Sequence, residues 1–216
     1  MSRTFERFAG ACAALVALGG VGYAIAFVFT VQSAPRGATY ASALFLLGGG
    51  LVSTVVMIAV YQRLRITEPS FAMLGLLLGV VGAVGSSIHG GLDLALLAKR
   101  PANTVANFPA NFVDPRGLLT FGFTALALLV IGWLIVRGGL LPRALGYLAF
   151  VGGALLVIVY LGRLIVLNPK SPGLLTAAVL SGFIVSPTWF LWVGWLLWRG
   201  QPAIPERSVV ITEGRP

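Results

Sequence analysis

Residues 86–100, SSIHGGLDLALLAKR, hold the side chains with the widest chemical range in this chain. His89 is the only histidine, and Asp93 follows four residues later as one of six acidic residues. Residues with this spacing share one face of a helix, and Ser86 lies one turn before His89 on that face. An imidazole there can carry a proton, hydrogen-bond a quinone carbonyl or ligate a metal. These three residues are therefore a candidate intramembrane polar site.

Arg163 joins this candidate site because of its expected depth. At 1.5 Å per residue, Asp93 lies about 9 Å and Arg163 about 8 Å from the ends of their apolar segments, on the same side of the membrane. A lone charge near the centre of a membrane helix costs about 2.5–3.5 kcal/mol, which pairing relieves. We expect an Asp93–Arg163 ion pair that faces the interior. The alternative is that each side chain separately reaches headgroups or water.

His89 lies deeper than Asp93, about 15 Å from the same end. Besides a functional role, it can be a neutral imidazole hydrogen-bonded to Asp93 or to a carbonyl group of a neighbouring helix. One histidine and one cysteine, Cys12, supply neither bis-histidine haem ligation nor a zinc site. The sequence also lacks a phosphate-binding loop, Gly-x-Ser-x-Gly and His-Glu-x-x-His. We therefore assign no catalytic, cofactor-binding or metal-binding residue and expect no cofactor. A non-enzymatic role is favoured, and an enzyme is not excluded.

The composition places the chain in a membrane. Of its 216 residues, 58% are hydrophobic and 10% are charged, and its mean hydropathy is +0.96. Soluble domains carry about 25% charged residues, so this chain has too few to build a water-facing surface. Its net charge of +9 would suggest nucleic acid in a soluble protein. Here the basic residues lie at the ends of apolar segments, so no nucleic-acid partner is expected.

Six apolar segments are long enough to cross the hydrocarbon core, which takes about 20 helical residues. They are residues 8–31, 39–61, 71–98, 117–136, 143–167 and 173–198. They do not alternate between apolar and polar residues as the strands of a membrane barrel do. The sequence predicts an all-α fold, with one bundle of six transmembrane helices over residues 1–199. Residues 200–216 are short and interrupted by prolines, which predicts a mobile cytoplasmic tail.

The basic residues predict the orientation of this bundle. With six spans, both termini lie on one side, together with the second and fourth loops. That side carries most of the arginines and lysines, and such residues favour the cytoplasm. We therefore expect a multi-pass protein of the bacterial cytoplasmic membrane with both termini in the cytoplasm.

Glycines and tryptophans suggest how the helices pack. Small residues let membrane helices approach closely, and segment 71–98 carries Gly75, Gly79 and Gly82, so we expect it to lie centrally in the bundle. In segment 173–198, Pro187 removes a backbone hydrogen bond and predicts a kink. Trp189 and Trp192 are candidates to line a cavity opened by that kink. Their alternatives are packing and lipid-facing positions.

Residues 131–156, IGWLIVRGGLLPRALGYLAFVGGALL, contain a Gly-x-Leu-Pro-Arg-x-Leu-Gly turn between two apolar segments. This stretch resembles a bacterial family of small polytopic membrane proteins that is catalogued only as a domain of unknown function. The resemblance extends loosely over residues 5–198. It implies a six-helix protein of the bacterial inner membrane, and it implies no reaction, ligand or catalytic residue.

Three functions remain open on this sequence. Short loops and low intramembrane polarity favour a non-catalytic accessory or scaffold subunit of a larger membrane assembly. A small transporter or channel would use His89, Asp93 and Arg163 along one water-filled vestibule. A lipid- or quinone-binding protein or enzyme would need a lipid-accessible pocket that reaches His89. Membrane lipids are the expected partners, with other membrane subunits or a second copy of the chain as further candidates.

Overall fold

The computed structural model describes residues 1–33, 36–99, 112–166 and 171–200, and every regular element within these ranges is helical. Six helical segments there are long and apolar enough to cross a membrane. The predicted all-α bundle of six transmembrane helices is therefore confirmed. The predicted tail lies outside the described residues apart from Gly200, as does most of the third loop.

Four of the spans are single helices, and two are composite. The single helices are α1 (Arg3–Ser33), α2 (Arg36–Leu64), α3 (Pro69–Ala98) and α5 (Arg143–Ile165). The fourth span comprises a 3-10 turn, η1 (Pro115–Gly117), a π-helical turn, η2 (Leu118–Phe123), and α4 (Thr124–Gly138). The sixth span comprises α6 (Pro172–Val179), a second π-helical turn, η3 (Leu180–Val185), and α7 (Ser186–Arg199).

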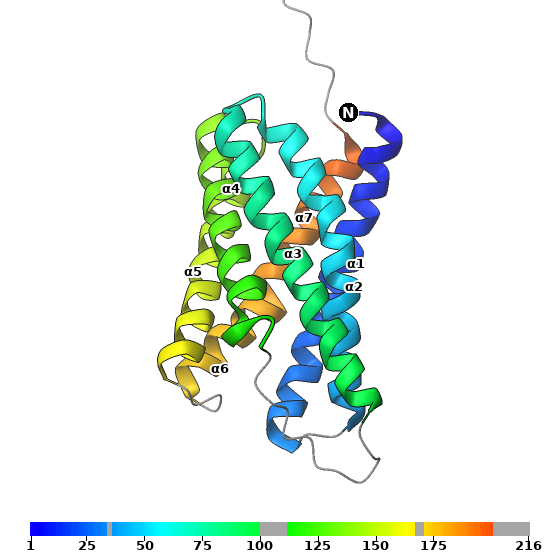
Figure 1. Ribbon diagram of the computed structural model, residues 1–216. Coiled ribbons are helices and arrows are strands. Elements are labelled where there is room, and N and C mark those ends of the chain that lie inside the picture. Colours follow the sequence, from blue (N-terminus) through cyan, green and yellow to red (C-terminus); the bar gives the residue numbers. More distant parts are fainter. Residues whose placement is uncertain (34–35, 100–111, 167–170, 201–216) are drawn as a thin grey trace, which may run out of the picture.

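The six spans form a ring that follows the chain order (Figure 1). α1 packs against α2 and α7, α3 lies between α2 and the fourth span, and α5 packs against α4, α6 and η3. Both ends of the described chain lie at one end of the bundle, where Arg3 Nη1 donates a hydrogen bond to the carbonyl oxygen of Arg199 at 3.0 Å. This is termed the terminal end. The opposite end, where α3 ends and η1 begins, is termed the loop end.

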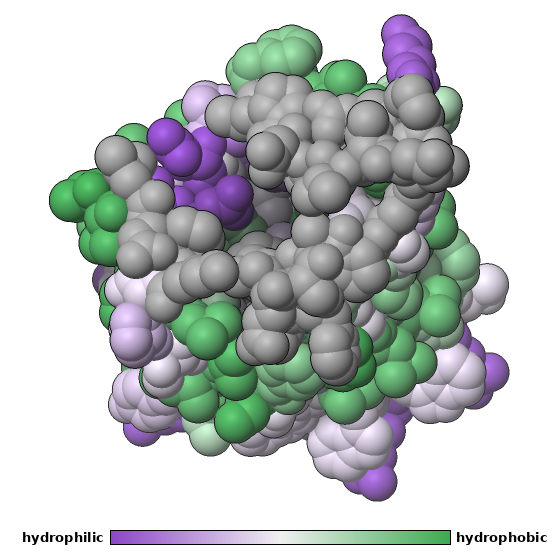
Figure 2. All heavy atoms as spheres, turned by 90° about the horizontal axis from the view of Figure 1, so that it is seen from below, coloured by the Kyte–Doolittle hydropathy of each residue, from purple (hydrophilic) through white to green (hydrophobic). Residues whose placement is uncertain are grey.

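The sides of the ring expose large apolar residues, among them Leu18, Leu51, Leu77 and Ile165. Seen from the loop end, apolar residues lie around much of the described rim, and strongly hydrophilic atoms form one group on the end face and further groups at the rim (Figure 2). Lipid chains solvate the exposed apolar sides of the ring, and the helices satisfy their backbone hydrogen-bonding groups internally. The protein is therefore embedded in the membrane as a multi-pass bundle.

The turn between α4 and α5 shows why its sequence pattern forms a hairpin. Gly139 has φ 64 and ends α4, with its N–H bonded to the carbonyl oxygen of Ile135 at 3.2 Å. Such a left-handed conformation is costly for residues with a Cβ, so glycine is favoured at this position. Pro142 precedes α5, and its carbonyl oxygen accepts the N–H of Leu145 at 2.9 Å. The two helices are therefore held antiparallel by a short turn.

The glycines of α3 face its two neighbours. A Cβ at Gly79 would lie 2.8 Å from Met57 Sδ of α2, and a Cβ at Gly82 would overlap Thr124 Oγ1 of α4. Between these contacts α3 exposes Leu77 and other large apolar side chains. α3 is therefore a member of the ring, and the expected central position is wrong. Its small residues face only two neighbouring helices, and a third side is exposed.

Pro187 lies at the start of α7, directly after the second π-helical turn. In that turn the N–H of Ser186 bonds to the carbonyl oxygen of Ser181, five residues back. Proline has no N–H group, so one backbone carbonyl group loses its usual partner, and a π-helical turn is one way in which a helix adjusts to this loss. The sixth span therefore accommodates its proline through a change of helix type.

A buried ion pair joins α1 to α2 near the terminal end. Arg63 Nη2 lies 3.0 Å from Glu6 Oε1, and the two residues are only 6% and 7% exposed. The same nitrogen lies 3.5 Å from the carbonyl oxygen of Leu196 on α7. Removing one partner of a buried pair leaves an uncompensated charge. One arginine therefore ties three helices together.

We predict that Glu6→Gln lowers the free energy of unfolding by about 3–5 kcal/mol, because it leaves the Arg63 charge buried without its carboxylate. The measurement is unfolding of the purified protein in mixed micelles by titration with dodecyl sulfate. Arg65→Gln is the control, since Arg65 is exposed. Equal stability of Glu6→Gln and the wild type would contradict the prediction.

The close contact between α3 and α4 gives a second prediction. Gly82→Ala should lower the free energy of unfolding by about 1–3 kcal/mol, because the added methyl group forces the two helices apart. Gly49→Ala on α2 is the matched control, since a Cβ there would meet no atom within 4 Å. In the same unfolding titration, equal free energies of unfolding for Gly82→Ala and Gly49→Ala would contradict the prediction. That result would mean that α3 and α4 accommodate the added methyl group at no cost.

Candidate functional site

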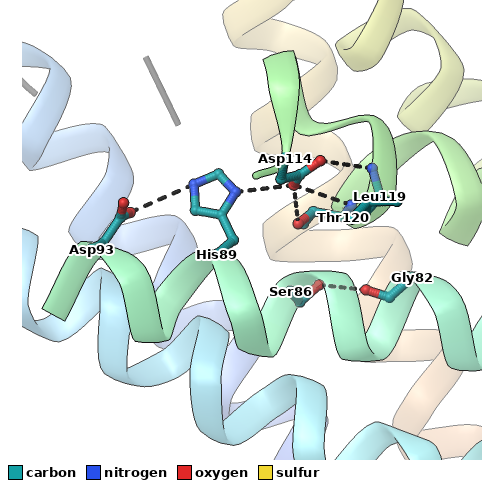
Figure 3. Close-up of polar contacts among 7 residues, drawn as sticks. All are labelled: Gly82, Ser86, His89, Asp93, Asp114, Leu119 and Thr120. Atoms are coloured by element: carbon teal, nitrogen blue, oxygen red, sulfur yellow. Dashed lines mark hydrogen bonds and ion pairs between the residues drawn. The ribbon is translucent and has the colours of Figure 1, made fainter. Parts of the chain in front are cut away.

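His89 lies between two carboxylates at the loop end (Figure 3). Its Nδ1 is 3.0 Å from Asp114 Oδ2, and its Nε2 is 3.5 Å from Asp93 Oδ2. The side chain of Asp114 is fully buried, whereas those of His89 and Asp93 are 12% and 22% exposed. His89, Asp93 and Asp114 are termed the triad. It has a buried end at Asp114 and a partly exposed end at Asp93.

Asp114 is positioned by the turn that begins the fourth span. Arg116 and Gly117 have φ values of 59 and 83, and they reverse the chain directly after Pro115. The carboxylate of Asp114 then accepts hydrogen bonds from the N–H groups of Leu119 at 2.7 Å and Thr120 at 3.3 Å, and from the Thr120 hydroxyl at 2.6 Å. An anion at the start of a helix is also favoured by the helix dipole.

These contacts decide the charge of Asp114. Burial raises the pKa of its carboxyl group, but hydrogen bonds from His89, Thr120 and the Leu119 N–H outweigh burial and hold the pKa below its usual value. Asp114 is therefore a carboxylate at neutral pH, and an acceptor only. His89 Nδ1 must then carry a proton in order to bond to it, and this leaves Nε2 facing Asp93.

The triad is arranged as a row. The two carboxylates contact opposite ring nitrogens of His89 (Figure 3). Within the described residues, no three histidine, cysteine or acidic side chains are grouped so that they could hold a metal ion. The chemistry that this row supports is proton binding by an imidazole whose orientation is fixed by a buried carboxylate.

Ser86 and Arg163 lie apart from His89 and Asp93. Ser86 Oγ donates a hydrogen bond to the carbonyl oxygen of Gly82 at 2.9 Å, within its own helix (Figure 3). The guanidinium carbon of Arg163 lies 5.2 Å from the centre of the Phe121 ring. Among the described residues Asp93 forms its ion pair with His89, and the expected Asp93–Arg163 pair is not present. The reason is the ring topology, which places α4 between α3 and α5.

Two adjoining cavities open inside the ring. The first has a volume of about 210 Å³ and is bounded by α1, η2, α5, α6, η3 and the first residue of α7. The second, of about 180 Å³, extends between α1, α2, α3 and the fourth span. Gly20, Tyr23, Phe121, Leu156 and Ser186 line both. The two cavities are therefore treated as two chambers of one interior space, the Arg163 chamber and the Ser86 chamber.

The Arg163 chamber is mainly apolar and has one charged residue. Its polar groups are Arg163, Tyr23, Ser181 and Ser186, and the remainder of its lining is aliphatic, glycine or the Phe121 ring. Both π-helical turns contribute to it, η2 through Phe121 and η3 through Ser181. Such turns are frequent at functional sites.

Tyr23 and η2 connect the chambers to the triad. Tyr23 lines both chambers and interacts electrostatically with Arg163, Asp93 and Asp114. Thr120 donates its hydroxyl to Asp114 and also lines the Ser86 chamber. The triad, the π-helical turn and the chambers are therefore neighbours in one site.

The tryptophans proposed as cavity residues take other positions. Trp189 is 2% exposed and packs edge-to-face on Phe190, with ring centres 5.1 Å apart. Trp192 packs against the hydrophobic core. Neither lines the two chambers, whereas Phe190 lines the Ser86 chamber. Of the alternatives left open by the sequence, packing describes both tryptophans.

No protein-family model, curated protein or solved structure matches this chain. The resemblance suggested by the turn between α4 and α5 therefore stays a prediction.

Asp114 and Tyr23 are two of the site residues that the sequence did not single out. Asp114 had a local signal, because an acidic residue directly before Pro115 and an apolar run is typical of the start of a helix. Tyr23 had no such signal, since a tyrosine within an apolar segment can lie either in a core or at a membrane surface. Spacing in the sequence identifies residues that are neighbours on one helix, but it does not identify contacts between residues on different helices.

We predict that Asp114→Asn lowers the free energy of unfolding at pH 7 by about 2–4 kcal/mol, because a neutral amide cannot replace three charge-assisted hydrogen bonds. The folded-state pKa of Asp114 lies below the unfolded value of about 3.9. Its stabilisation is therefore complete at neutral pH and is lost as the pH falls through the folded pKa. The deficit of the variant should shrink below about pH 4.

Unfolding in mixed micelles at pH 7, 5 and 3.5 measures this deficit. Glu68→Gln is the control, because Glu68 also accepts a backbone N–H at a helix start, from Phe71 at 2.7 Å, but in an exposed position. A deficit for Asp114→Asn no larger than that of Glu68→Gln at pH 7 would contradict the prediction.

Proposed function

We propose that this protein binds an amphipathic anion in the Arg163 chamber, with the guanidinium as the contact for the anionic headgroup and the apolar lining as the contact for its chain. The observation that carries the proposal is a single cation on the wall of a mainly apolar chamber. Among the described residues, no carboxylate lies within ion-pair distance of Arg163.

The energetics favour an anion at this position. A charge in apolar surroundings is costly unless it is paired and hydrogen-bonded. The Phe121 ring, 5.2 Å from the guanidinium carbon, offers only its π face to the cation. A carboxylate or phosphate oxygen would supply the missing charge-assisted hydrogen bonds. The two chambers together are of the order of small-molecule sites, about 300–1,000 Å³.

This function belongs to the lipid- or quinone-binding class foreseen from the sequence. The charge of Arg163 favours an anionic headgroup over a quinone, which carries none. A transporter that uses His89, Asp93 and Arg163 along one vestibule is less well supported, because only Arg163 of the three lines either chamber. An accessory or scaffold role makes no use of the chambers and stays a prediction.

We further propose that the protein lies in a bacterial cytoplasmic membrane with its terminal end in the cytoplasm. The support is the arginine content of that end, which includes Arg3, Arg63, Arg137 and Arg199. Arg163 lies near the opposite end, so the headgroup of the ligand would face outward. Partnership with other membrane subunits, or with a second copy of the chain, also stays a prediction.

Oleate and oleyl alcohol test the proposal, because they share a chain and differ in headgroup charge. With the protein in nanodiscs of zwitterionic lipid, oleate should bind at least about 10-fold more tightly, which is the worth of one charge-assisted hydrogen bond. Arg163→Gln should remove this preference, and Arg163→Lys should retain most of it. Native mass spectrometry of the complexes measures the binding.

The control is Arg137→Gln. Arg137 also lies over an aromatic ring, that of Trp133 at 5.0 Å, but it is exposed at the terminal end. Equal affinity for oleate and oleyl alcohol, or an unchanged preference in Arg163→Gln, would overturn the proposal. Adding phosphatidylglycerol to the nanodiscs distinguishes two natural sources of the anion, since an anionic lipid would displace oleate and a site for free fatty acids would keep it.

A further inference from the structure

We propose that His89 and Asp93 form an exchangeable proton-binding site at the loop end, with Asp114 as the fixed anion that positions it. The proposal concerns the triad alone and does not rest on ligand binding in the Arg163 chamber. It assigns to the chain's only histidine the role of taking up and releasing one proton.

The geometry of His89 supports this assignment. Asp114 is fully buried and accepts hydrogen bonds from Leu119 and Thr120 as well as facing His89 Nδ1, so it holds that nitrogen in its protonated form. Rotation of the ring would break this contact. Nε2 is therefore the position at which the proton content of the imidazole changes.

Asp93 makes the second position favourable for a proton. When Nε2 carries no proton, its lone pair faces the negatively charged Asp93 Oδ2 at 3.5 Å. Uptake of one proton from water converts this repulsion into an ion pair, with an imidazolium donating toward both carboxylates. The triad then changes its net charge from −2 to −1, and release is the same step in reverse.

The site is also reachable. Asp93 and His89 are 22% and 12% exposed, and they lie in the last turns of α3 before the loop end. Asp114, on the opposite side of the imidazole, is fully buried and out of contact with water. A proton therefore enters and leaves past Asp93.

Other titratable groups lie at this end of the bundle. Tyr23 on α1 interacts electrostatically with both carboxylates, and Arg163 on α5 acts on Tyr23. Tyr40 lies near the start of α2, Arg116 is exposed in η1, and Lys99 is exposed after α3. Within the described residues, only Asp93 and Asp114 lie within ion-pair distance of the imidazole.

The single histidine makes the test direct. Protein labelled with ¹⁵N-histidine, and purified without a polyhistidine tag, gives the ring-nitrogen signals of His89 alone. In nanodiscs without added ligand, Nδ1 should stay protonated from pH 5 to 9, while Nε2 passes through one single-proton transition. In Asp93→Asn this transition should move to lower pH by about one unit or more, because a neighbouring opposite charge is lost. Asp93→Glu should restore most of that shift.

Glu68→Gln at the other end is the control and should titrate as the wild type does. Ring-nitrogen signals that stay constant from pH 5 to 9 would overturn the proposal. So would an Asp93→Asn transition at the wild-type pH. Asp93 is partly exposed, whereas Asp114 is fully buried, so Asp93→Asn avoids the folding deficit expected for Asp114→Asn. Because no fatty acid is present, the outcome is separate from that of the oleate experiment.

Discussion

The buried carboxylate of Asp114 is the interaction on which the loop end depends. Its two oxygens accept backbone and hydroxyl hydrogen bonds from the first residues of η2 and face His89 on α3. It therefore joins the start of the fourth span to the third, and it does so where the backbone has just adopted positive φ values at Arg116 and Gly117. The position of Phe121, and with it one wall of both chambers, follows from this capped turn.

The arginines at the two ends of the bundle have different surroundings: Arg63 is buried and Arg163 is half-buried. At the terminal end, Arg63 is paired with Glu6 and its charge is used to hold α1, α2 and α7 together. Near the loop end, Arg163 lies on the wall of a chamber against an aromatic ring. A paired cation in a closed contact is structural, whereas a cation on a chamber wall is available to a molecule that enters. This contrast separates an arginine that holds helices together from the arginine to which we assign ligand binding.

Much of the fold could be predicted from the sequence, and the site only in part. Apolar runs of about 20 residues fix the number of spans, because few other structures bury so many apolar side chains. The contact between His89 and Asp93 is also local, since four residues on a helix make neighbours. Arg163 was matched to Asp93 by depth alone, and depth does not say which helices are adjacent. Asp114 lies 25 residues from His89, and only tertiary structure brings them together.

The two π-helical turns fix the rotation of the segments that follow them. In η3 the N–H of Ser186 reaches back five residues to Ser181, so one residue more than in an α-helix is accommodated within the membrane. One residue corresponds to about 100° of rotation around a helix axis. With an α-helical turn in its place, Trp189 would leave the core, and Ser181 of η3 and Ser186 of α7 would no longer both line the Arg163 chamber. The register of α7 against α1 thus depends on a single residue in mid-span, and a deletion there would rotate α7 against α1.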